Sequence, residues 1–347
     1  MKYAVKKLGL MLLTMLSVSF LAFLAFQIIP GDPTNTILGT DATPELVAAL
    51  RAELGLDRPF FVRYFDWLGS FVQGDFGKSY SYNMPVAEML AGKLGVTLLL
   101  AALSFVLTVL VSIPVGIFSA ERGGWVDKTV TVLGQVTMAV PPFFIGILLT
   151  YIFGLLLQWF TPGEFIAPQQ NFWGSVGYLV FPAVAIALPR IAMTVKMLRS
   201  GILAELKKDY VRTAHSRGND RHAILYRHVL RNAVVPTVAF LAMTIADIVA
   251  GSVVIEKVFA IPGMGRLLFS SIANRDYPVV QAIIVLMAFW VVLVNFLADI
   301  INQRLDPRLR LQSGGDSHEE ELLFACRSGD HRPGNGTGRA GMLLDSL

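Results

Sequence analysis

The chain has 347 residues, of which 54% are hydrophobic and only 16% charged, and its formal net charge at pH 7 is +4. A soluble domain rarely carries so few charges for this apolar content, and the apolar residues occur in runs of about 20, the length that crosses a bilayer. The single cysteine, Cys326, excludes a disulfide framework and a cysteine-based zinc cluster. Because the basic residues flank apolar runs, we interpret the positive charge as a membrane signal and expect no nucleic-acid partner.

Six apolar segments are long enough to span a membrane, and together they predict an all-α polytopic membrane protein with six transmembrane helices. They are Leu8–Ile29, Gly95–Ala120, Val130–Gln158, Val176–Leu198, Val234–Glu256 and Val279–Ile301. Several contain proline, which a bilayer tolerates because neighbouring helices and polar side chains satisfy the freed backbone groups. We therefore expect kinked helices that pack around one another.

Lysine and arginine residues concentrate in four regions that six spans would place on one side of the membrane. These regions are the amino terminus, the second-to-third connection, the fourth-to-fifth connection and the end of the sixth span. The third-to-fourth connection, residues 159–175, contains neither residue type. The positive-inside rule then predicts a cytoplasmic amino terminus. The run that begins at Leu8 is too long for a cleaved signal sequence, so we expect it to be retained as the first span.

The composition divides the chain into four parts. We expect a first transmembrane helix in residues 1–29, a periplasmic loop in 30–94, a five-helix membrane core in 95–311 with a basic loop at 199–232, and a disordered tail in 312–347.

Two helical patterns occur in the long first loop. One begins at Pro44, with proline in the first turn, and the other carries aromatic residues at helical spacing from Phe60 to Phe71. The aromatic helix either lies at the membrane surface or packs against the ends of the spans, and the sequence leaves both alternatives open.

No motif in the sequence indicates catalysis. Gly77-Lys78-Ser79 resembles the end of a phosphate-binding loop, but Val72 occupies the position of the earlier glycine and no strand pattern precedes it. The histidines of the basic loop lack the i, i+4 spacing of a helical metal site. We therefore expect no enzymatic activity, no metal and no cofactor.

Polar residues inside membrane spans are expensive to bury and are candidates for function by default. Gln135 in the third predicted span and Asp247 in the fifth are the candidates for lining a pathway. We expect Asp247 to face the interior of the helix bundle. This side chain either lines a pathway or forms a structural hydrogen bond between helices, and we favour the structural role.

The basic connection Glu205–Pro236 has internal order that a spacer would not need. Apolar side chains recur at i+3 and i+4 and predict one helical stripe, made of Leu203, Leu206, Tyr210 and Ala214. Gly218 suits the left-handed position after a helix, and Asn219 or Asp220 can cap a second helix. A short amphipathic helix in such a loop can dock in a groove of a partner or lie on anionic lipid, and the pattern fits both.

Four separated stretches within residues 1–311 resemble one known family. They are ELKKDYVRTAHSRG with RHVLRNAVVP in the basic loop, Ile29-Pro30-Gly31-Asp32-Pro33, LGLDRPFFVRYFDWLGSFVQGDFGKS, and IEKVFAIPGMGRLLFSSIANRDYPVVQ, and the end Leu305–Arg310 also fits. They look like the permeases of binding-protein-dependent ABC transporters, in the branch for dipeptides, oligopeptides and nickel. Four such motifs together are far more specific than any one of them alone.

The resemblance implies a permease subunit in the bacterial inner membrane. A periplasmic binding protein would deliver the solute, two different permease subunits would form the pathway by alternating access, and separate ATPase subunits would drive it through coupling helices. The implied coupling positions are Glu205, Leu206, Tyr210, Arg212, Ala214 and Gly218. We expect the Leu206–Tyr210–Ala214 stripe to be the docking face and Gly218 to be the pivot.

The family branch moves short peptides, glutathione and nickel complexes. Because the spans contain no cluster of histidine or cysteine, we expect di- or oligopeptides, with nickel or glutathione as the alternatives within the branch. A hypothesis from another class is a membrane receptor or scaffold whose basic loop binds lipid or a partner without moving any solute.

Overall fold

The computed structural model describes residues 2–28, 34, 38, 43–53 and 55–305, and its described residues form helices and turns without any strand. Contacts group Met1–Asn302 into one compact unit. The helices are α1 (Lys2–Ile28), α3 (Pro44–Glu53), α4 (Phe60–Val72), α5 (Val86–Leu90), α6 (Lys93–Arg122), α7 (Gly124–Ala139), α8 (Pro142–Leu149), α9 (Phe172–Glu205), α10 (Asp209–Ser216), α11 (Arg221–Ile224), α12 (Leu230–Val258), α13 (Met264–Ala273) and α14 (Tyr277–Leu305), with π-helical η2 (Thr150–Leu156) and η3 (Leu225–Val229). The motif at residues 29–33, the stretch from residue 306 and the predicted tail lie outside the described residues.

Five helical segments are long and apolar enough to cross a membrane. They are Val5–Ile28, Val86–Arg122, Phe172–Glu205, Arg221–Val258 and Tyr277–Ile301. A sixth crossing requires that the bent pair Gly124–Ala139 and Pro142–Leu156 count as one span. The prediction of an all-α polytopic membrane protein is confirmed.

The predicted third span, Val130–Gln158, differs from the single kinked helix that we expected. α7 and the α8–η2 segment meet at 98°. Val140 and Pro141 between them are extended, with ψ of 126° and 139°. The ring of a proline disfavours helical geometry in the residue before it, so Pro141 and Pro142 together force two successive residues out of the helix. Single prolines in the other spans lie inside continuous helices, at Pro114, Pro182, Pro189 and Pro236.

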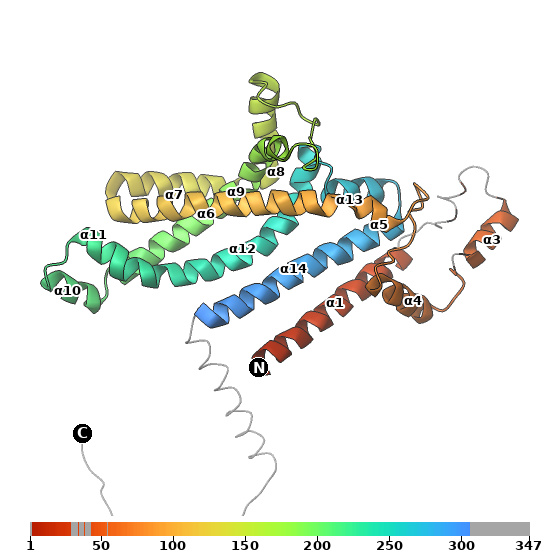
Figure 1. The fold of residues 1–347 in the computed structure, drawn as a ribbon, viewed down its shortest axis with the longest axis horizontal. Helices are drawn as coiled ribbons and strands as arrows, with labels where there is room; N and C mark the ends of the chain where they lie inside the picture. Colours follow the sequence, from red (N-terminus) through yellow and green to blue (C-terminus); the bar gives the residue numbers. More distant parts are fainter. Residues whose placement is uncertain (1, 29–33, 35–37, 39–42, 54, 306–347) are drawn as a thin grey trace, which may run out of the picture. The chain divides into compact units, whose positions relative to one another are not determined.

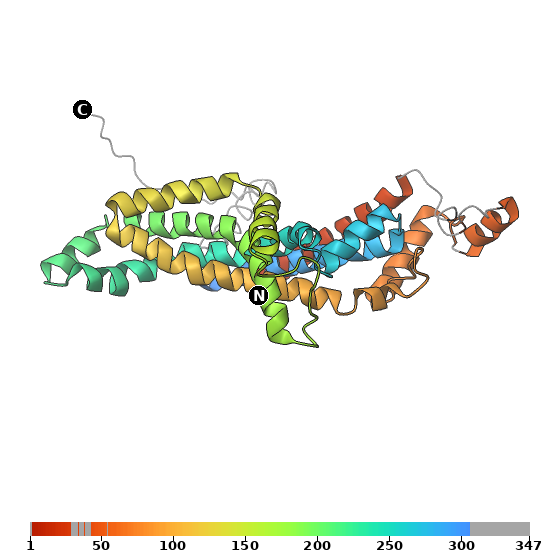
Figure 2. The same cartoon turned by 90° about the horizontal axis from the view of Figure 1, so that it is seen from above.

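Helices α6, α9 and α12 lie side by side and form the core, with α9 in contact with both of the others (Figures 1 and 2). The middle of α9 is rich in small side chains, and Ala183, Ala185 and Ala187 are fully buried. On α6, a Cβ added to Gly116 would lie 3.1 Å from the Leu198 side chain of α9. Small residues at these positions let the helices approach closely, as in other membrane helix pairs.

The aromatic helix α4 packs against α1. Tyr64 is only 3% exposed, its hydroxyl is 2.9 Å from the Ser19 hydroxyl, and its ring lies 5.4 Å from that of Phe20. Phe61 and Phe65 on the other side of α4 are 63% and 62% exposed. One face therefore packs on a span, as the second alternative predicted, while the exposed aromatic face has the character of residues at lipid headgroups.

A buried carboxylate holds the turn between α12 and α13. Glu256 accepts hydrogen bonds from the Thr97 hydroxyl (2.6 Å) and the Gly265 amide (2.6 Å). The Thr97 hydroxyl in turn accepts one from the Met264 amide at 3.0 Å. A Cβ on Gly263 would overlap the Glu256 carboxylate, so glycine at this position leaves room for these contacts. These contacts explain why the sequence IEKVFAIPGMGR combines a glutamate with two glycines, because a buried carboxyl group needs hydrogen-bond partners.

The Gly77-Lys78-Ser79 segment also has a structural role. The Ser79 hydroxyl donates to Asp276, which is fully buried in the turn between α13 and α14. The amides of Tyr80 and Ser81 donate to the same carboxylate, at 3.0 and 3.4 Å. Asp276 thus fastens the segment before α5 to the start of α14, and the serine hydroxyl is used in this contact.

We predict that Asp276→Asn lowers the free energy of unfolding by about 1–3 kcal/mol, because an amide nitrogen would face groups that need an acceptor. The measurement is thermal unfolding of the purified protein in detergent. The control is Asp66→Asn, since Asp66 is 62% exposed and its 3.4 Å pair with Arg58 lies at the surface, where ion pairs contribute about 0–1 kcal/mol. Equal melting temperatures for the two variants would contradict the assignment.

Candidate coupling site

The basic connection between α9 and α12 folds as a turn, the short helix α10, a second turn and α11, beyond the ends of the two long helices (Figure 1). α9 ends at Glu205, and Lys208 is extended with ψ of 152° before α10 begins at Asp209. The predicted stripe Leu203–Ala214 is therefore divided between two helices, in place of the single helix that we expected. Periodicity alone could not locate this break, because the apolar spacing continues through it.

Glu205 fixes α10 to the end of α9. Its carboxylate accepts a hydrogen bond from the Tyr210 hydroxyl at 2.7 Å and pairs with Lys208, and its side chain is 14% exposed. The Asn232 amide lies 3.5 Å from the same hydroxyl, which links the start of α12 to this contact. Burial raises the pKa of Tyr210, and Glu205 acts in the same direction, so the phenol keeps its proton and donates.

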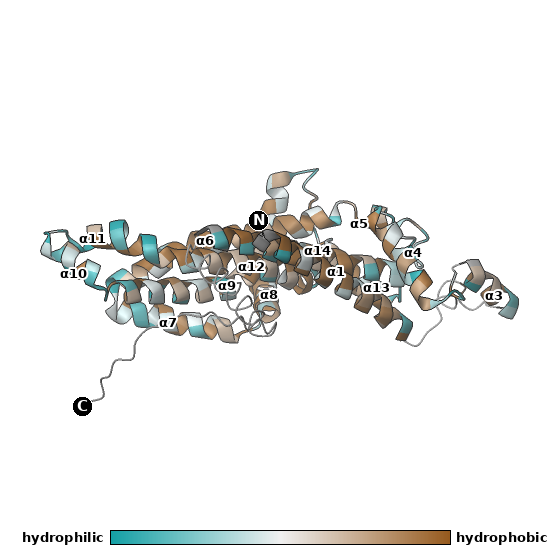
Figure 3. Ribbon diagram, turned by 90° about the horizontal axis from the view of Figure 1, so that it is seen from below, coloured by the Kyte–Doolittle hydropathy of each residue, from teal (hydrophilic) through white to brown (hydrophobic). Residues whose placement is uncertain are grey.

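The apolar face of α10 points toward the chain's own core. Ala214 is 9% exposed and belongs to a cluster with Ile202 and Val229, and Leu206 packs against that cluster. We expected this face to dock a partner, but in this chain it packs on the chain's own core, as the apolar stripe of an amphipathic helix commonly does. The outward face is charged, with the side chains of Asp209 and Arg212 96% and 81% exposed, and Figure 3 colours much of α10 and α11 as hydrophilic.

The second turn matches the prediction closely. Gly218 has φ of +84°, in the left-handed region that favours glycine. Of the two predicted caps, Asp220 accepts from the Ala223 amide at 3.0 Å, while the Asn219 amide donates to the Ala214 carbonyl at 3.1 Å. α11 then continues through η3 into α12 as one segment, Arg221–Val258, so the second helix is the start of a span.

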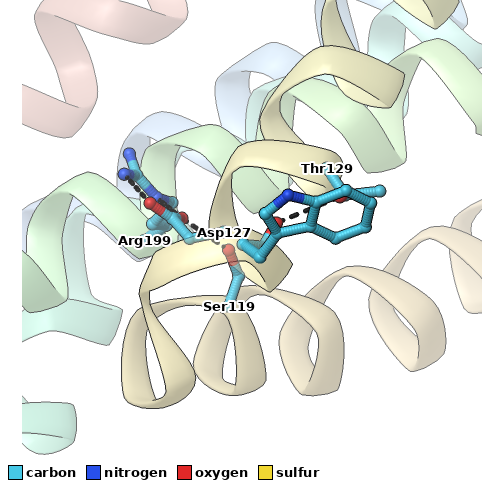
Figure 4. A network of polar contacts seen from close by, with 5 residues as sticks. Ser119, Asp127, Thr129 and Arg199 are labelled. Carbon is cyan, nitrogen blue, oxygen red and sulfur yellow. Dashed lines mark hydrogen bonds and ion pairs between the residues drawn. The ribbon is translucent and has the colours of Figure 1, made fainter.

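A polar network joins this region to α6 and α7 (Figure 4). Arg199 of α9 forms a two-point ion pair with Asp127 of α7, with 2.5 Å between Nη2 and Oδ2, and Ser119 of α6 donates to Asp127 at 2.8 Å. Arg221 donates to the Glu121 carbonyl at 3.2 Å. Sequence reasoning counted Arg199 only as a positive charge and missed Asp127, because no local pattern pairs residues so far apart.

The two pathway candidates are both exposed, so Asp247 does not face the interior of this chain's own helices as we expected. Asp247 on α12 has a 62% exposed side chain, and its Oδ2 is 3.6 Å from Nη1 of Arg190 on α9. Gln135 is exposed on α7. Sequence reasoning missed Arg190, whose signal was a charge in the middle of an apolar run. Within the described residues, no group of three or more metal-binding side chains comes together.

Comparison with known proteins decides the family. The sequence model of one protein family, the binding-protein-dependent transport system inner membrane component, matches residues 112–311. The family model for the N-terminal part of such membrane components matches residues 1–101. The chain belongs to this family. It is therefore a multi-pass inner-membrane permease subunit of an ABC transporter, which works with an ATPase and a binding protein. A receptor or scaffold that moves no solute does not fit this membership.

Its relatives match over almost their whole length. A probable peptide ABC transporter permease protein of Sinorhizobium fredii is 35% identical over 89% of this chain and 99% of its own. A putative peptide transport system permease protein of Brucella abortus is 38% identical over 85% and 95%. An oligopeptide transport system permease protein of Bacillus subtilis is 34% identical over 88% and 98%.

We predict that Asp127→Asn in this permease lowers the free energy of unfolding by about 1.5–3 kcal/mol, because Arg199 loses a charged partner with two contacts. The matched control is Asp209→Asn, the same chemical change at a side chain that is 96% exposed, where we expect a change within about 0.5 kcal/mol. Both are measured by thermal unfolding in detergent. If Asp209→Asn lowers the melting temperature as much as Asp127→Asn does, the network adds nothing to stability.

Proposed function

We propose that this permease imports di- or oligopeptides that a periplasmic binding protein delivers. The support is that relatives from three genera, matched over 94% or more of their own lengths, are all named for peptide or oligopeptide transport. The described residues contain no metal-binding cluster of histidine, cysteine, aspartate or glutamate that would favour nickel.

The direct test is uptake into proteoliposomes that contain the whole transporter. We expect a labelled dipeptide to accumulate only when ATP and the binding protein are both present. Unlabelled peptides should compete with this uptake, and nickel or glutathione should not. Import of nickel or glutathione in place of peptides would overturn the proposed substrate class and keep the family.

We propose that α10 is the coupling helix and that its charged outer face contacts the ATPase. On this proposal Arg212 lies in the contact, while Leu206 and Ala214 seat the helix on the permease. Glu205 and Tyr210 hold its angle to α9, and Gly218 turns the chain into α11. The contacts that support this are the buried inner face of α10 and the hydrogen bonds of Tyr210 to Glu205 of α9 and to Asn232 of α12.

We propose a cytoplasmic amino terminus. Lys7 of α1 donates to Asp299 of α14 at 2.6 Å, so the amino end of α1 lies beside the last turns of α14. Basic residues flank both ends, which agrees with the positive-inside rule. On this proposal residues 30–94 lie in the periplasm and the basic loop 199–232 lies in the cytoplasm.

We propose that the functional pathway forms between this chain and a second, different permease subunit. Asp247 supports this, since a charged side chain that is 62% exposed on a membrane span needs water or protein beside it. Asp247 and Gln135 are the residues that we assign to the pathway.

We predict that Arg212→Glu weakens association with the ATPase subunit and lowers uptake, because it reverses a charge on the proposed contact face. The measurements are co-purification of the ATPase and ATP-driven uptake. Arg58→Glu is the matched control, since Arg58 is also well exposed, at 65%, but lies in the proposed periplasmic loop. ATPase recovery that falls equally in both variants, or in neither, would contradict the assignment of α10.

A further inference from the structure

Arg190 and Asp247 place two opposite charges deep inside the membrane-spanning helices. Arg190 lies about 22 Å along α9 from the Glu205 end, and Asp247 lies about 26 Å along α12 from its first residue, at 1.5 Å per residue. The apolar core of a bilayer is about 30 Å thick. Because α9 and α12 leave the same loop and run side by side, their similar distances bring the two charges to one level.

These charges lie on an open face of the chain. The side chains of Arg190 and Asp247 are 30% and 62% exposed. Met243, one turn from Asp247 on α12, is 56% exposed, and Met193 on α9 is 46% exposed. Contact of such charges with lipid tails is costly, so charged residues in spans face a bundle interior or a water-filled cavity. The face around Asp247 is therefore one that water, solute or protein covers.

The pair also has unused hydrogen-bonding capacity. A separation of 3.6 Å between Nη1 of Arg190 and Oδ2 of Asp247 exceeds a hydrogen bond. A guanidinium has five N–H donors and a carboxylate has about four acceptor sites. The Arg199–Asp127 pair differs, since it has two short contacts and its side chains are only 24% and 18% exposed. That arrangement is typical of an arginine–aspartate pair with a structural role.

We propose that Arg190 and Asp247 form a binding site for the charged ends of a dipeptide in the translocation pathway, since the ends of a longer extended peptide, at about 3.3 Å per residue, lie too far apart for one such pair. The Arg190 guanidinium binds the terminal carboxylate, and the Asp247 carboxylate binds the terminal ammonium. When the pathway is empty, the two charges neutralise each other, which reduces the cost of their position in the membrane. Because the site binds only the two charged ends, it makes no specific contact with the peptide side chains. Dipeptides of different sequence can therefore use one site.

This inference rests on the proposed peptide import and is tested in the same assembled transporter. The variants are Arg190→Gln and Asp247→Asn, which remove one charge each with little change in size, and the control is Asp66→Asn, the same chemical change at a side chain that is 62% exposed on α4, outside the candidate spans. At saturating binding protein, we expect each charge-removing variant to take up a labelled dipeptide about tenfold more slowly or worse, the effect of one charge-assisted hydrogen bond. Arg190→Lys should restore part of the rate, and the control should match the unaltered protein.

A second measurement does not depend on the folding of these variants. A photo-crosslinking amino acid in place of Met243 should attach labelled dipeptide in the presence of ATP and the binding protein. The same photo-crosslinking amino acid in place of Phe65, which is 62% exposed on α4, should attach no dipeptide.

Three outcomes would overturn the inference. One is normal uptake in both charge-removing variants, and another is no crosslink at Met243 while the unaltered transporter imports peptide. The third is loss of the second permease subunit from the purified variants, which would assign the pair to the subunit interface. Failure of the unaltered transporter to import any peptide would instead refute the proposed substrate, and so the two failures are distinguishable.

Discussion

The packing of α9 between α6 and α12 is the constraint on which the rest of the structure depends. Its small, fully buried side chains allow α6 and α12 to approach it closely. Among the described residues, no other helix contacts both α6 and α12 as extensively as α9 does. Once α9 is fixed, three charged side chains on it are positioned against other parts of the chain. Arg190 meets Asp247, Arg199 meets Asp127, and Glu205 meets Tyr210.

Buried and partly buried carboxylates secure the helices at both ends. Glu256 and Asp276 hold the turns around α13, and Asp127 and Glu205 hold the region next to α10. Each of these four has several protein partners, as the cost of removing a carboxylate from water requires. Asp247 differs, because its only charged partner among the described residues is at 3.6 Å, and this difference separates a site that binds from contacts that hold the fold.

Hydrophobic runs and backbone preferences predicted much of this fold from the sequence. The apolar segments gave the spans, and Gly218 and Asp220 gave the second turn, since both signals are local. The 98° break at Pro141–Pro142 was read as a kink, because composition does not distinguish a bent span from a broken one. The inward direction of Ala214 and the partners of Arg190 were missed, since both depend on helices far apart in the sequence.

The position of α10 gives a physical link between the proposed coupling helix and the proposed peptide site. Tyr210 of α10 is hydrogen-bonded to Glu205 of α9 and to Asn232 of α12. Arg190 lies on α9 and Asp247 on α12. A displacement of α10 that rotates one helix against the other must change the distance between the two charges. Coulomb energy falls with that distance, so the strength with which the pair competes for the peptide's ends changes as well. A force on the ATPase side can thus alter affinity about 22 Å away along α9, through two helices and one loop, which is what alternating access requires of an importer.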